Sequence, residues 1–587
     1  MHTFRVWAPS AGAVDLVLPG TDPGTDPDTG GRRPMERSDG GWWALEVPGA
    51  GHGDDYAFSV DGSEPRPDPR SGWQPGGVHG PSRVFDAARH DWQDGDWPGR
   101  EVLRALFYEL HVGTFTPEGT LDAAVGRLDH LVELGVDVVE VMPVAAFDGR
   151  WGWGYDGVAL YAVHAGYGGP EAFQRFVDAC HARGLAVCLD VVYNHLGPSG
   201  NYLATFGPYF TERHQTPWGA AVNLDDEGSD GVRRWIVDNA LRWFEDFHVD
   251  ALRLDAVHAL VDDSPRHVLA QLSDEVATLS QRLGRPLALV AESDLNDPSV
   301  VEPTADGGWG LTAQWSDDFH HAVHALLAGE TQGYYVDFGT IDVLARTLTT
   351  VFRHAGDHST FRGADWGRPV DPARHRGHLF LGYQQNHDQI GNRAIGDRLS
   401  ATLPPGRLAA GAALVLTSPF TPMLFMGEEW AASTPWQFFT DFGDAELGAA
   451  VREGRRGEFA DHGWAAHDVP DPQDGATREA SVLDWAEPGK PQHARMLGWY
   501  RDLVALRRAE PDLRDDDLRR VAVETGPGWV AVRRGTFDVL VNLGEEPATL
   551  PARPGSVVAA WPELAPEVGD GGLVLAPDAV AVVRTRA

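Results

Sequence analysis

Residues 251–258 have the sequence Ala-Leu-Arg-Leu-Asp-Ala-Val-His, a short apolar run that ends in charged and polar side chains. This pattern predicts a buried strand of a parallel sheet followed by a loop. Side chains at positions i and i+2 of a strand share a face, so Arg253 and Asp255 are expected to point together. The guanidinium would lower the pKa of Asp255 and keep it ionised, as a nucleophile requires. The alternative is a structural ion pair at the end of the strand.

Seven similar runs accompany this one, and helical patterns such as 172–182, 232–247 and 494–508 alternate with them or follow them. In chain order the eight runs are 106–111, 138–143, 185–190, 251–255, 287–292, 311–317, 378–383 and 422–428. Eight strand-then-helix units predict an α/β fold, a (β/α)8 TIM barrel. Barrel enzymes carry their chemistry at the C-terminal ends of the strands, where several of these runs end in carboxylates.

Two all-β domains are predicted to flank the barrel. Residues 1–95 and 513–587 contain alternating apolar runs between turn-rich segments, as in a small β-sandwich, which leaves 96–512 for the barrel and its inserted loops. The first sandwich would be of the carbohydrate-binding or immunoglobulin-like type, and its segment 19–34 is expected to be a loop. The apolar runs are 4–8, 14–18, 42–47 and 56–60 in the first domain and 529–532, 539–542 and 580–583 in the second.

The composition excludes some classes of partner. The 587 residues include 86 acidic and 48 basic ones, a net charge of −38, which repels phosphate backbones and anionic lipid. Neither nucleic acid nor a membrane is therefore expected as a partner, and no apolar run approaches the ~20 residues that span a bilayer. The N-terminal residues do not resemble a secretory signal. Cys180 and Cys188 are expected to be buried thiols in a reducing cytoplasm.

Glu292 ends the fifth predicted strand, and its surroundings suit an acid. Nearby aspartates and an apolar strand end should raise its pKa, as a general acid near neutral pH requires. The alternative is a solvated acid at the end of a strand. A retaining glycosidase needs two carboxyl groups about 5–5.5 Å apart, and a barrel rim could bring Asp255 and Glu292 to that spacing.

Other polar residues follow the third and seventh predicted strands. His387 and Asp388 lie in the polar segment 383–393, and Asn194 and His195 directly follow an apolar run. For His195 a structural role is the alternative. Tryptophans in predicted loops could stack on the apolar faces of sugars, with burial in the core as the alternative. They are Trp151, Trp153, Trp218, Trp315, Trp366, Trp430 and Trp436.

Four of these segments resemble, in order, the signature regions of the α-amylase superfamily, glycoside hydrolase family 13. They are 190–195, 253–258, Glu292 with its strand, and 386–388. The resemblance implies that Asp255 is the nucleophile, Glu292 the proton donor and Asp388 the stabiliser of the transition state. The residues expected to line the substrate site are Tyr155, His195, Arg253, His258 and His387.

Within this superfamily the chain resembles the maltooligosyltrehalose trehalohydrolase family over nearly its whole length. The segments that carry the likeness are 108–119, 200–203, 216–221, 252–258, 315–321 and 385–393. His258-Ala259 departs from the Lys-His of many amylases and agrees with this family. By position and likeness, the residues that would recognise the trehalose end are Asp317, Asp318, His320, His321, Gln389 and Asn392. Asn194 resembles a calcium-ligand position of amylases, but an oxygen cage needs several partners, and no metal or cofactor is predicted.

The resemblance implies hydrolysis of the α-1,4 bond that joins a maltooligosaccharide to a terminal trehalose, with a maltooligosyltrehalose synthase as the functional partner. Two alternatives stay open. One is a glycogen branching enzyme, a transglycosylase with a similar layout and a similar start at 108–113. The other is a glycan-binding protein without catalysis.

Overall fold

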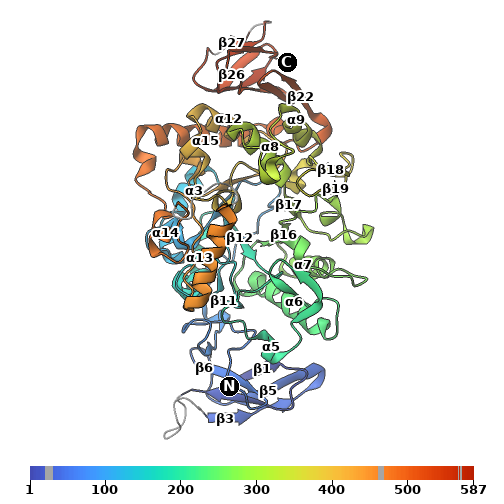
Figure 1. Ribbon diagram of the computed structural model, residues 1–587, viewed down its shortest axis with the longest axis vertical. Coiled ribbons are helices and arrows are strands. Elements are labelled where there is room, and N and C mark those ends of the chain that lie inside the picture. The colour runs from blue at the N-terminus through green and yellow to red at the C-terminus, as the bar shows by residue number, and fades with distance from the viewer. Residues whose placement is uncertain (20–30, 461–467, 566, 569–570, 587) are drawn as a thin grey trace.

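Eight parallel strands close into a barrel at the centre of the molecule (Figure 1), as the sequence predicts. The computed structural model describes residues 1–19, 31–460, 468–565, 567–568 and 571–586. The barrel strands are β8 (Phe107–Leu110), β9 (Val138–Val141), β12 (Ala186–Val191), β15 (Ala251–Leu254), β16 (Ala288–Ala291), β17 (Ala313–Trp315), β20 (Phe380–Tyr383) and β21 (Thr421–Phe425). Each lies within one of the eight apolar runs or overlaps it, so the predicted barrel is confirmed.

The barrel strands are buried on both faces, which explains their continuous apolar sequences. Every residue of β9 and β15 is buried, and Phe107, Ala186 and Ala288 belong to one apolar cluster. Cys188 lies in that cluster, Cys180 lies in a helix, and both are buried free thiols, as predicted.

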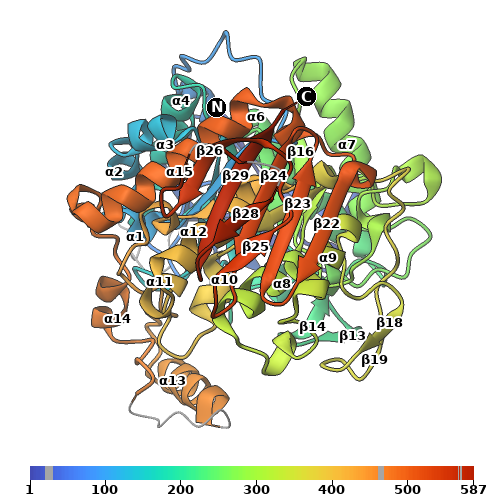
Figure 2. The ribbon, with the colours of Figure 1, turned by 90° about the horizontal axis from the view of Figure 1, so that it is seen from above.

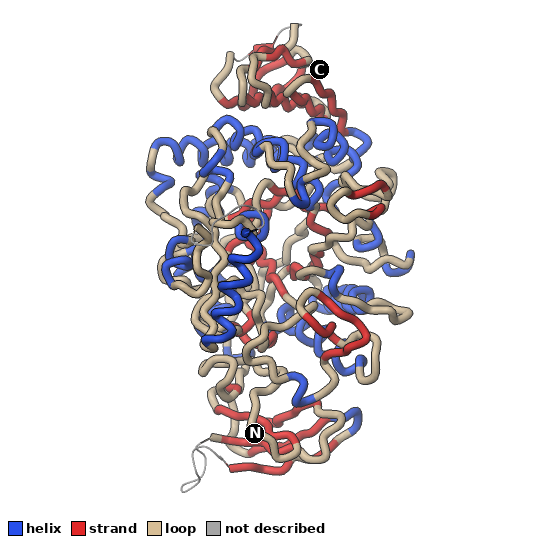
Figure 3. Tube along the Cα trace, in the orientation of Figure 1, coloured by secondary structure: helices blue, strands red, loops and turns tan. Residues whose placement is uncertain are grey.

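Helices cover the outside of the barrel, and Figure 3 shows them as a layer around the central strands. The longest are α4 (Gly169–His181), α6 (Ser229–Asp246), α7 (Val268–Leu283), α8 (Asp317–Ala328), α12 (Pro405–Leu416), α13 (Ala445–Ala460) and α15 (Pro491–Ala509). In α6 the aromatic side chains of Trp235, Trp243 and Phe244 are all buried, and truncating one such aromatic to alanine costs about 3–5 kcal/mol. None of the described helices combines the length and apolarity that a membrane crossing requires.

Two small sheets form the N-terminal part. One contains β1 (His2–Trp7), β5 (Trp42–Val47) and β4 (Glu36–Arg37). The other contains β3 (Gly31–Pro34), β2 (Val14–Leu18), β6 (Asp55–Val60) and β7 (Ser82–Arg83). The prediction of a loop over 19–34 is wrong for 31–34, because these residues pair with β2, and residues 20–30 lie outside the described part.

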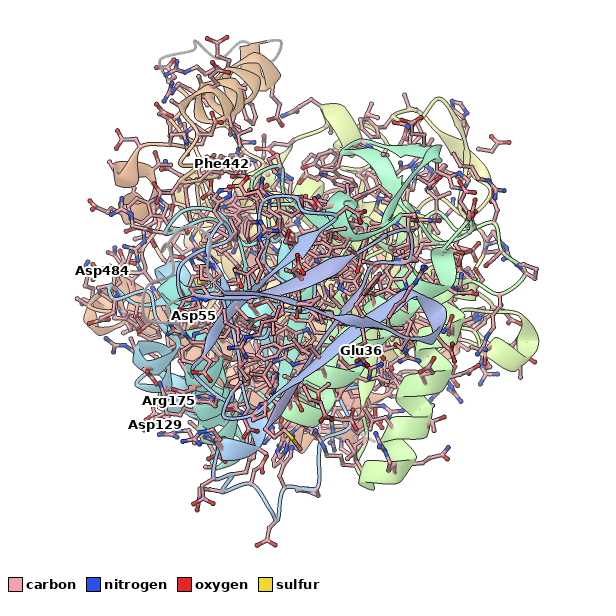
Figure 4. The ribbon with its side chains drawn as sticks, turned by 90° about the horizontal axis from the view of Figure 1, so that it is seen from below. Glu36, Asp55, Asp129, Arg175, Phe442 and Asp484 are labelled. Atoms are coloured by element: carbon pink, nitrogen blue, oxygen red, sulfur yellow. The ribbon has the colours of Figure 1, made fainter. Side chains whose placement is uncertain are left out.

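The N-terminal sheets pack against the α6 side of the barrel. Arg70 Nη1 lies 2.8 Å from Asp238 Oδ2, and the Trp235 Nε1 atom donates a hydrogen bond to Pro69 O at 3.0 Å. Figure 4, seen from below, shows the strands that carry Glu36 and Asp55 crossing the end of the barrel. These contacts fix the N-terminal part to the barrel.

The C-terminal part is a six-stranded antiparallel sheet with a two-stranded one beside it. The larger sheet contains β22 (Val521–Gly526), β23 (Trp529–Arg534), β24 (Phe537–Asn542), β29 (Ala579–Thr585), β26 (Gly555–Trp561) and β27 (Glu567–Val568), and the smaller one β25 (Ala548–Leu550) and β28 (Leu573–Leu575). Figure 2 shows the large sheet lying over α8, α12 and α9 (Ile341–Thr350). An Arg407–Asp578 ion pair of 2.8 Å joins α12 to this domain. The exact domain boundaries at 95/96 and 512/513 remain predictions.

Candidate active site

Arg253 is the centre of a cluster of acids at the C-terminal ends of the barrel strands. Its guanidinium is fully buried, and its Nη1 donates to Asp255 Oδ1 at 2.8 Å and to Asp190 at 2.9 and 3.0 Å. Its Nη2 lies 3.0 Å from Glu292 Oε2. One cation from β15 therefore holds acids that follow β15 and β16, together with an acid of β12.

Asp255 is held in its ionised form. Burial acts to raise its pKa, but the Arg253 charge and a hydrogen bond from Asn194 outweigh burial and lower the pKa below its ordinary value. Asn194 Nδ2 donates to Asp255 Oδ2 at 2.9 Å, so both carboxylate oxygens are oriented. The side chain keeps 10% of its surface exposed, which leaves it open to a reacting atom.

Glu292 has the opposite protonation. Burial raises its pKa well above the ordinary value, and the neighbouring charges of Asp255, Asp388 and Asp317 add to this against the effect of Arg253. Ala256 N donates to its Oε2 at 2.7 Å, and 17% of its side chain is exposed. The pKa values of the two carboxyl groups are thus shifted in opposite directions, the division that acid–base catalysis requires.

Asp388 and His387 begin the short helix α10 (His387–Gly391) after β20. Asp388 is the most open of the three acids, with 36% of its side chain exposed, and its Oδ1 lies 3.7 Å from His387 Nε2. The His387 ring is buried against Glu109 of β8, and its backbone N donates to Glu109 Oε2 at 2.9 Å. Burial lowers the pKa of His387, but Glu109 and Asp388 outweigh it and raise the pKa to about 9.

The Glu109–His387 pair makes stability depend on pH. Since the pKa of His387 is raised from 6.5 to about 9 on folding, its contribution is complete below pH 6.5 and is lost as the pH rises through 9. We expect the free energy of unfolding to lose on the order of 3 kcal/mol from this group over that interval. Urea unfolding at pH 6.5 and 9.5, compared with His387→Gln, measures it; an equal pH dependence in the variant would contradict the assignment.

Tyr155 connects this pair to the Arg253 cluster. Its hydroxyl donates to Asp190 Oδ2 at 2.6 Å and lies 2.8 Å from His387 Nε2. His195 Nε2 lies 3.0 Å from Tyr155 O, and its ring is stacked on Trp218, centroids 4.4 Å apart. The predicted residues Tyr155, His195, Arg253 and His387 are therefore brought together with the three acids.

His258 and the predicted trehalose-end residues are more dispersed. His258 Nδ1 accepts a hydrogen bond from Asp294 N at 3.3 Å. Asp317 accepts a hydrogen bond from the Tyr383 hydroxyl, and burial raises its pKa to about 7. Asn392 Nδ2 donates weakly to Asp388 Oδ1 at 3.4 Å, which places Asn392 beside Asp388.

Gln389 and His321 share one aromatic neighbour. Gln389 Oε1 accepts a hydrogen bond from the Tyr334 hydroxyl at 3.2 Å, and the His321 ring is stacked on Tyr334, centroids 4.9 Å apart. Burial lowers the pKa of His321 to about 3, so it is a neutral ring.

Two residues that were predicted to contact the substrate are buried, so the prediction is wrong for them. Asp318 is buried and its Oδ2 accepts hydrogen bonds from Arg353 N at 2.6 Å and from His354 N at 3.1 Å, so it fixes a loop. His320 is fully buried and packed between aromatic rings, with its Nδ1 3.0 Å from His321 Nδ1. Neither side chain has a surface that a sugar could touch directly.

Several tryptophans expected to stack on sugars are instead core residues. Trp430 and Trp436 are completely buried, and Trp153 is buried as well. Trp315 is buried, and its ring centroid lies 4.4 Å from the Arg253 guanidinium carbon, so it packs against the cation at the centre of the acid cluster. Trp218 is the one with a large open surface, 50% exposed, and Trp151 and Trp366 are partly exposed.

One group of three possible metal ligands occurs within the described residues, namely His214, Asp225 and Asp263. It includes none of the predicted site residues. Arg213 lies 3.8 Å from Asp225 and 3.6 Å from Asp263, so a guanidinium already offsets part of the charge of these two carboxylates. The prediction that no metal is required stays a prediction.

Sequence reasoning gave no role to two residues that contact the acid cluster, Glu109 and Asp190. Glu109 and Asp190 are charged residues inside apolar strands, which is the signal that could have identified them. Asn194 was predicted as a polar residue after a buried strand and was compared with a calcium ligand of amylases; in the structure it donates a hydrogen bond to Asp255. Trp218 forms a platform with His195 at the turn between β13 (Phe210–Thr216) and β14 (Gly219–Val222).

Comparisons with known proteins agree with this architecture. Family models match three parts of the chain: carbohydrate-binding module 48 (isoamylase N-terminal domain) at 1–73, the alpha amylase catalytic domain at 81–214, and a domain of unknown function at 516–582. A crystal structure of a Salmonella typhimurium protein, provisionally described as an alpha amylase, is 39% identical. Its TM-score is 0.90, with 100% of this chain and 97% of that chain covered.

Curated relatives define the family more narrowly. A 1,4-alpha-glucan branching enzyme of Vibrio parahaemolyticus is 35% identical, but over only 54% of this chain and 46% of its own length. Malto-oligosyltrehalose trehalohydrolase of Arthrobacter ramosus is 54% identical over 99% of both chains. That of Rhizobium sp. (strain M-11) is 50% identical over 99% of this chain and 97% of its own. With its barrel, its acids and these full-length relatives, the chain belongs to the malto-oligosyltrehalose trehalohydrolase family, glycoside hydrolases of the α-amylase superfamily.

Proposed function

We propose that this enzyme releases trehalose from maltooligosyltrehalose by hydrolysing the adjoining α-1,4 bond with net retention. The observation that carries the proposal is the single Arg253 guanidinium between Asp255 and Glu292. Its adjacent nitrogens lie 2.8 Å from Asp255 Oδ1 and 3.0 Å from Glu292 Oε2. This arrangement suits the 5–5.5 Å carboxyl spacing of retaining enzymes better than the ~6.5–9.5 Å spacing of inverting ones.

In the first step Glu292 protonates the glycosidic oxygen while Asp255 attacks the anomeric carbon. The bond to the leaving trehalose breaks, and a covalent bond between the glycosyl residue and Asp255 forms. In the second step Glu292, now ionised, takes a proton from water, which attacks the same carbon and frees Asp255. The lowered pKa of Asp255 and the raised pKa of Glu292 support these roles.

Asp388 and the residues around it would bind the sugar ring at the cleavage point. Asp388 is open to solvent and would hydrogen-bond sugar hydroxyls more strongly as the ring flattens. Tyr155 and His195 would contact the same ring, with Trp218 as an apolar platform beyond His195. The charged His387 is buried behind them and would position the Tyr155 hydroxyl and Asp388. We assign recognition of the trehalose end to Asp317, His321, Gln389 and Asn392, with His258 beside them.

Substrate choice is tested by separate incubation with maltooligosyltrehalose and with the maltooligosaccharide of equal length. We expect free trehalose from the first and at least about tenfold lower kcat/KM on the second, because only the first fills the trehalose-binding positions. Equal rates on both would reject trehalose recognition and leave the glycosidase mechanism intact. New α-1,6 branches at constant pool size would instead identify the branching reaction.

The proposed reaction depends on another enzyme that makes its substrate. A maltooligosyltrehalose synthase would supply the terminal trehalose unit, and the pair would serve trehalose biosynthesis. Two buried reduced thiols and the absence of disulfides among the described residues fit work in the cytoplasm.

A further inference from the structure

A cavity of about 280 Å³ lies at the end of the barrel opposite to the catalytic acids. Its lining includes Ala105 and Leu106, directly before β8, and Asp137, directly before β9, so it lies at the N-terminal ends of the strands. Asp255 and Glu292, by contrast, follow the C-terminal ends. The cavity is therefore separate from the substrate site.

The lining of this cavity is strongly basic. The lining contains five arginines and two carboxylates, Glu101 and Asp137, and Asp516 outside the lining pairs with one of the arginines, which leaves a surplus of two positive charges. The arginines are Arg100, Arg104, Arg507, Arg508 and Arg514. In a chain with a net charge of −38, a local surplus of cations does not follow from the average composition.

Two carboxylates near the cavity, Asp137 and Asp516, are already paired with arginines of its lining. Asp137 Oδ1 accepts hydrogen bonds from Arg100 at 2.8 Å and from Arg508 at 2.6 Å, so one acid serves two guanidinium groups. Arg104 is paired with Asp516. Within the described residues, Arg507 and Arg514 have no ion pair with a carboxylate.

Arg507 is the most constrained of the five. It is 5% exposed, and its Nη1 and Nη2 atoms donate only to backbone carbonyls, namely those of Leu416, Ser418, Phe420 and Leu513. Its Nε is buried without a hydrogen-bond partner. Burial lowers its pKa to about 9, and the like charges of Arg534 and Arg514 add to this effect. A buried cation without a counter-ion is costly, and an anion in the cavity would remove that cost.

We propose that this cavity binds a small oxyanion, either inorganic phosphate or the phosphoryl group of a small metabolite. Guanidinium groups match the oxygens of a phosphoryl group in planar, often bidentate hydrogen bonds. The volume is at the lower limit of ordinary ligand pockets, about 300 Å³, so it admits a small anion. A long polyanion is disfavoured by the net charge of −38 of the whole chain.

The test compares phosphate with salt on the full-length enzyme. Phosphate is expected to raise the Tm in a saturable way, whereas sodium chloride of equal ionic strength is not, because only a bound ligand stabilises the folded state by mass action. Calorimetric titration with phosphate, glucose 6-phosphate and uncharged glucose identifies the source. Tighter binding of glucose 6-phosphate indicates a metabolite, tighter binding of phosphate the free ion, and no binding of either overturns the proposal.

Variants locate the ligand. Arg514→Gln, alone and with Arg508→Gln, should raise the Kd for phosphate about tenfold or more for each guanidinium removed. Arg175→Gln is the matched control, because Arg175 is 49% exposed against 50% for Arg508, is also paired with an aspartate, and lies at the periphery (Figure 4). Asp255→Asn should bind phosphate as tightly as the wild type, which separates this proposal from the catalytic one. An unchanged Kd in the double variant, or an equal loss in Arg175→Gln, would overturn it.

Discussion

Asp255→Asn is expected to lower kcat by roughly 10⁴-fold or more while the fold is kept. The amide is neutral and cannot form the covalent bond to the anomeric carbon, and no other described carboxylate takes both a hydrogen bond from Asn194 and one from Arg253. The measurement is single-turnover and steady-state kinetics on maltooligosyltrehalose, with circular dichroism to verify the fold.

Asp297→Asn is the control for this substitution. Asp297 lies after the same strand as Glu292, is partly exposed, and is paired with Arg368 outside the acid cluster. Its variant should keep most of the activity. If pure Asp255→Asn protein kept more than about 1% of wild-type turnover, the nucleophile would have to be another group.

Glu292→Gln is expected to lower kcat on the natural substrate by about 10²–10⁴-fold, the usual contribution of a general acid. Glycosides with good leaving groups need no proton in the first step, so their glycosyl-enzyme should form at a rate close to that of the wild type. The burst of leaving group, compared between the two substrates, measures this difference.

The pH profile gives a second readout for Glu292. Because the raised pKa of Glu292 keeps it protonated, activity of the wild type should fall on the alkaline side as the pH rises through that pKa. The acid side should fall only below the ordinary range of aspartate, since the pKa of Asp255 is lowered. In Glu292→Gln the alkaline fall should be absent from the burst phase; an unchanged profile would assign it to another group.

The barrel was predictable because its strands are buried on both faces. Parallel strands of this kind are continuous apolar runs, and the run 251–255 gave β15 within one residue. The position of Asp255 and Glu292 at one rim of the barrel was predictable for a related reason, since both directly follow apolar strands, whereas the roles of the three acids came from the family resemblance. Their protonation states needed the structure, because both depend on Arg253 and on burial.

The burial of the tryptophans and the pairing of residues far apart in the sequence were not predictable in the same way. A tryptophan in a predicted loop has the same local sequence whether it packs inward, as Trp436 does, or outward, as Trp218 does. Asp318 and His320 were placed in the site by their neighbourhood to Asp317, but a helix turns successive side chains in different directions, and these two point into the protein. Nothing near Glu109 in the chain indicates that its partner is His387.

The Glu109–His387 pair also affects how the chain folds during its synthesis. Glu109 leaves the ribosome 278 residues before His387, on the order of half a minute at ordinary rates of synthesis. During this interval the first strand has an acid that is expensive to bury without its cation. A nascent chain that lacks the seventh strand is therefore expected not to close the barrel early. The acid cluster then forms only when all eight barrel strands are present.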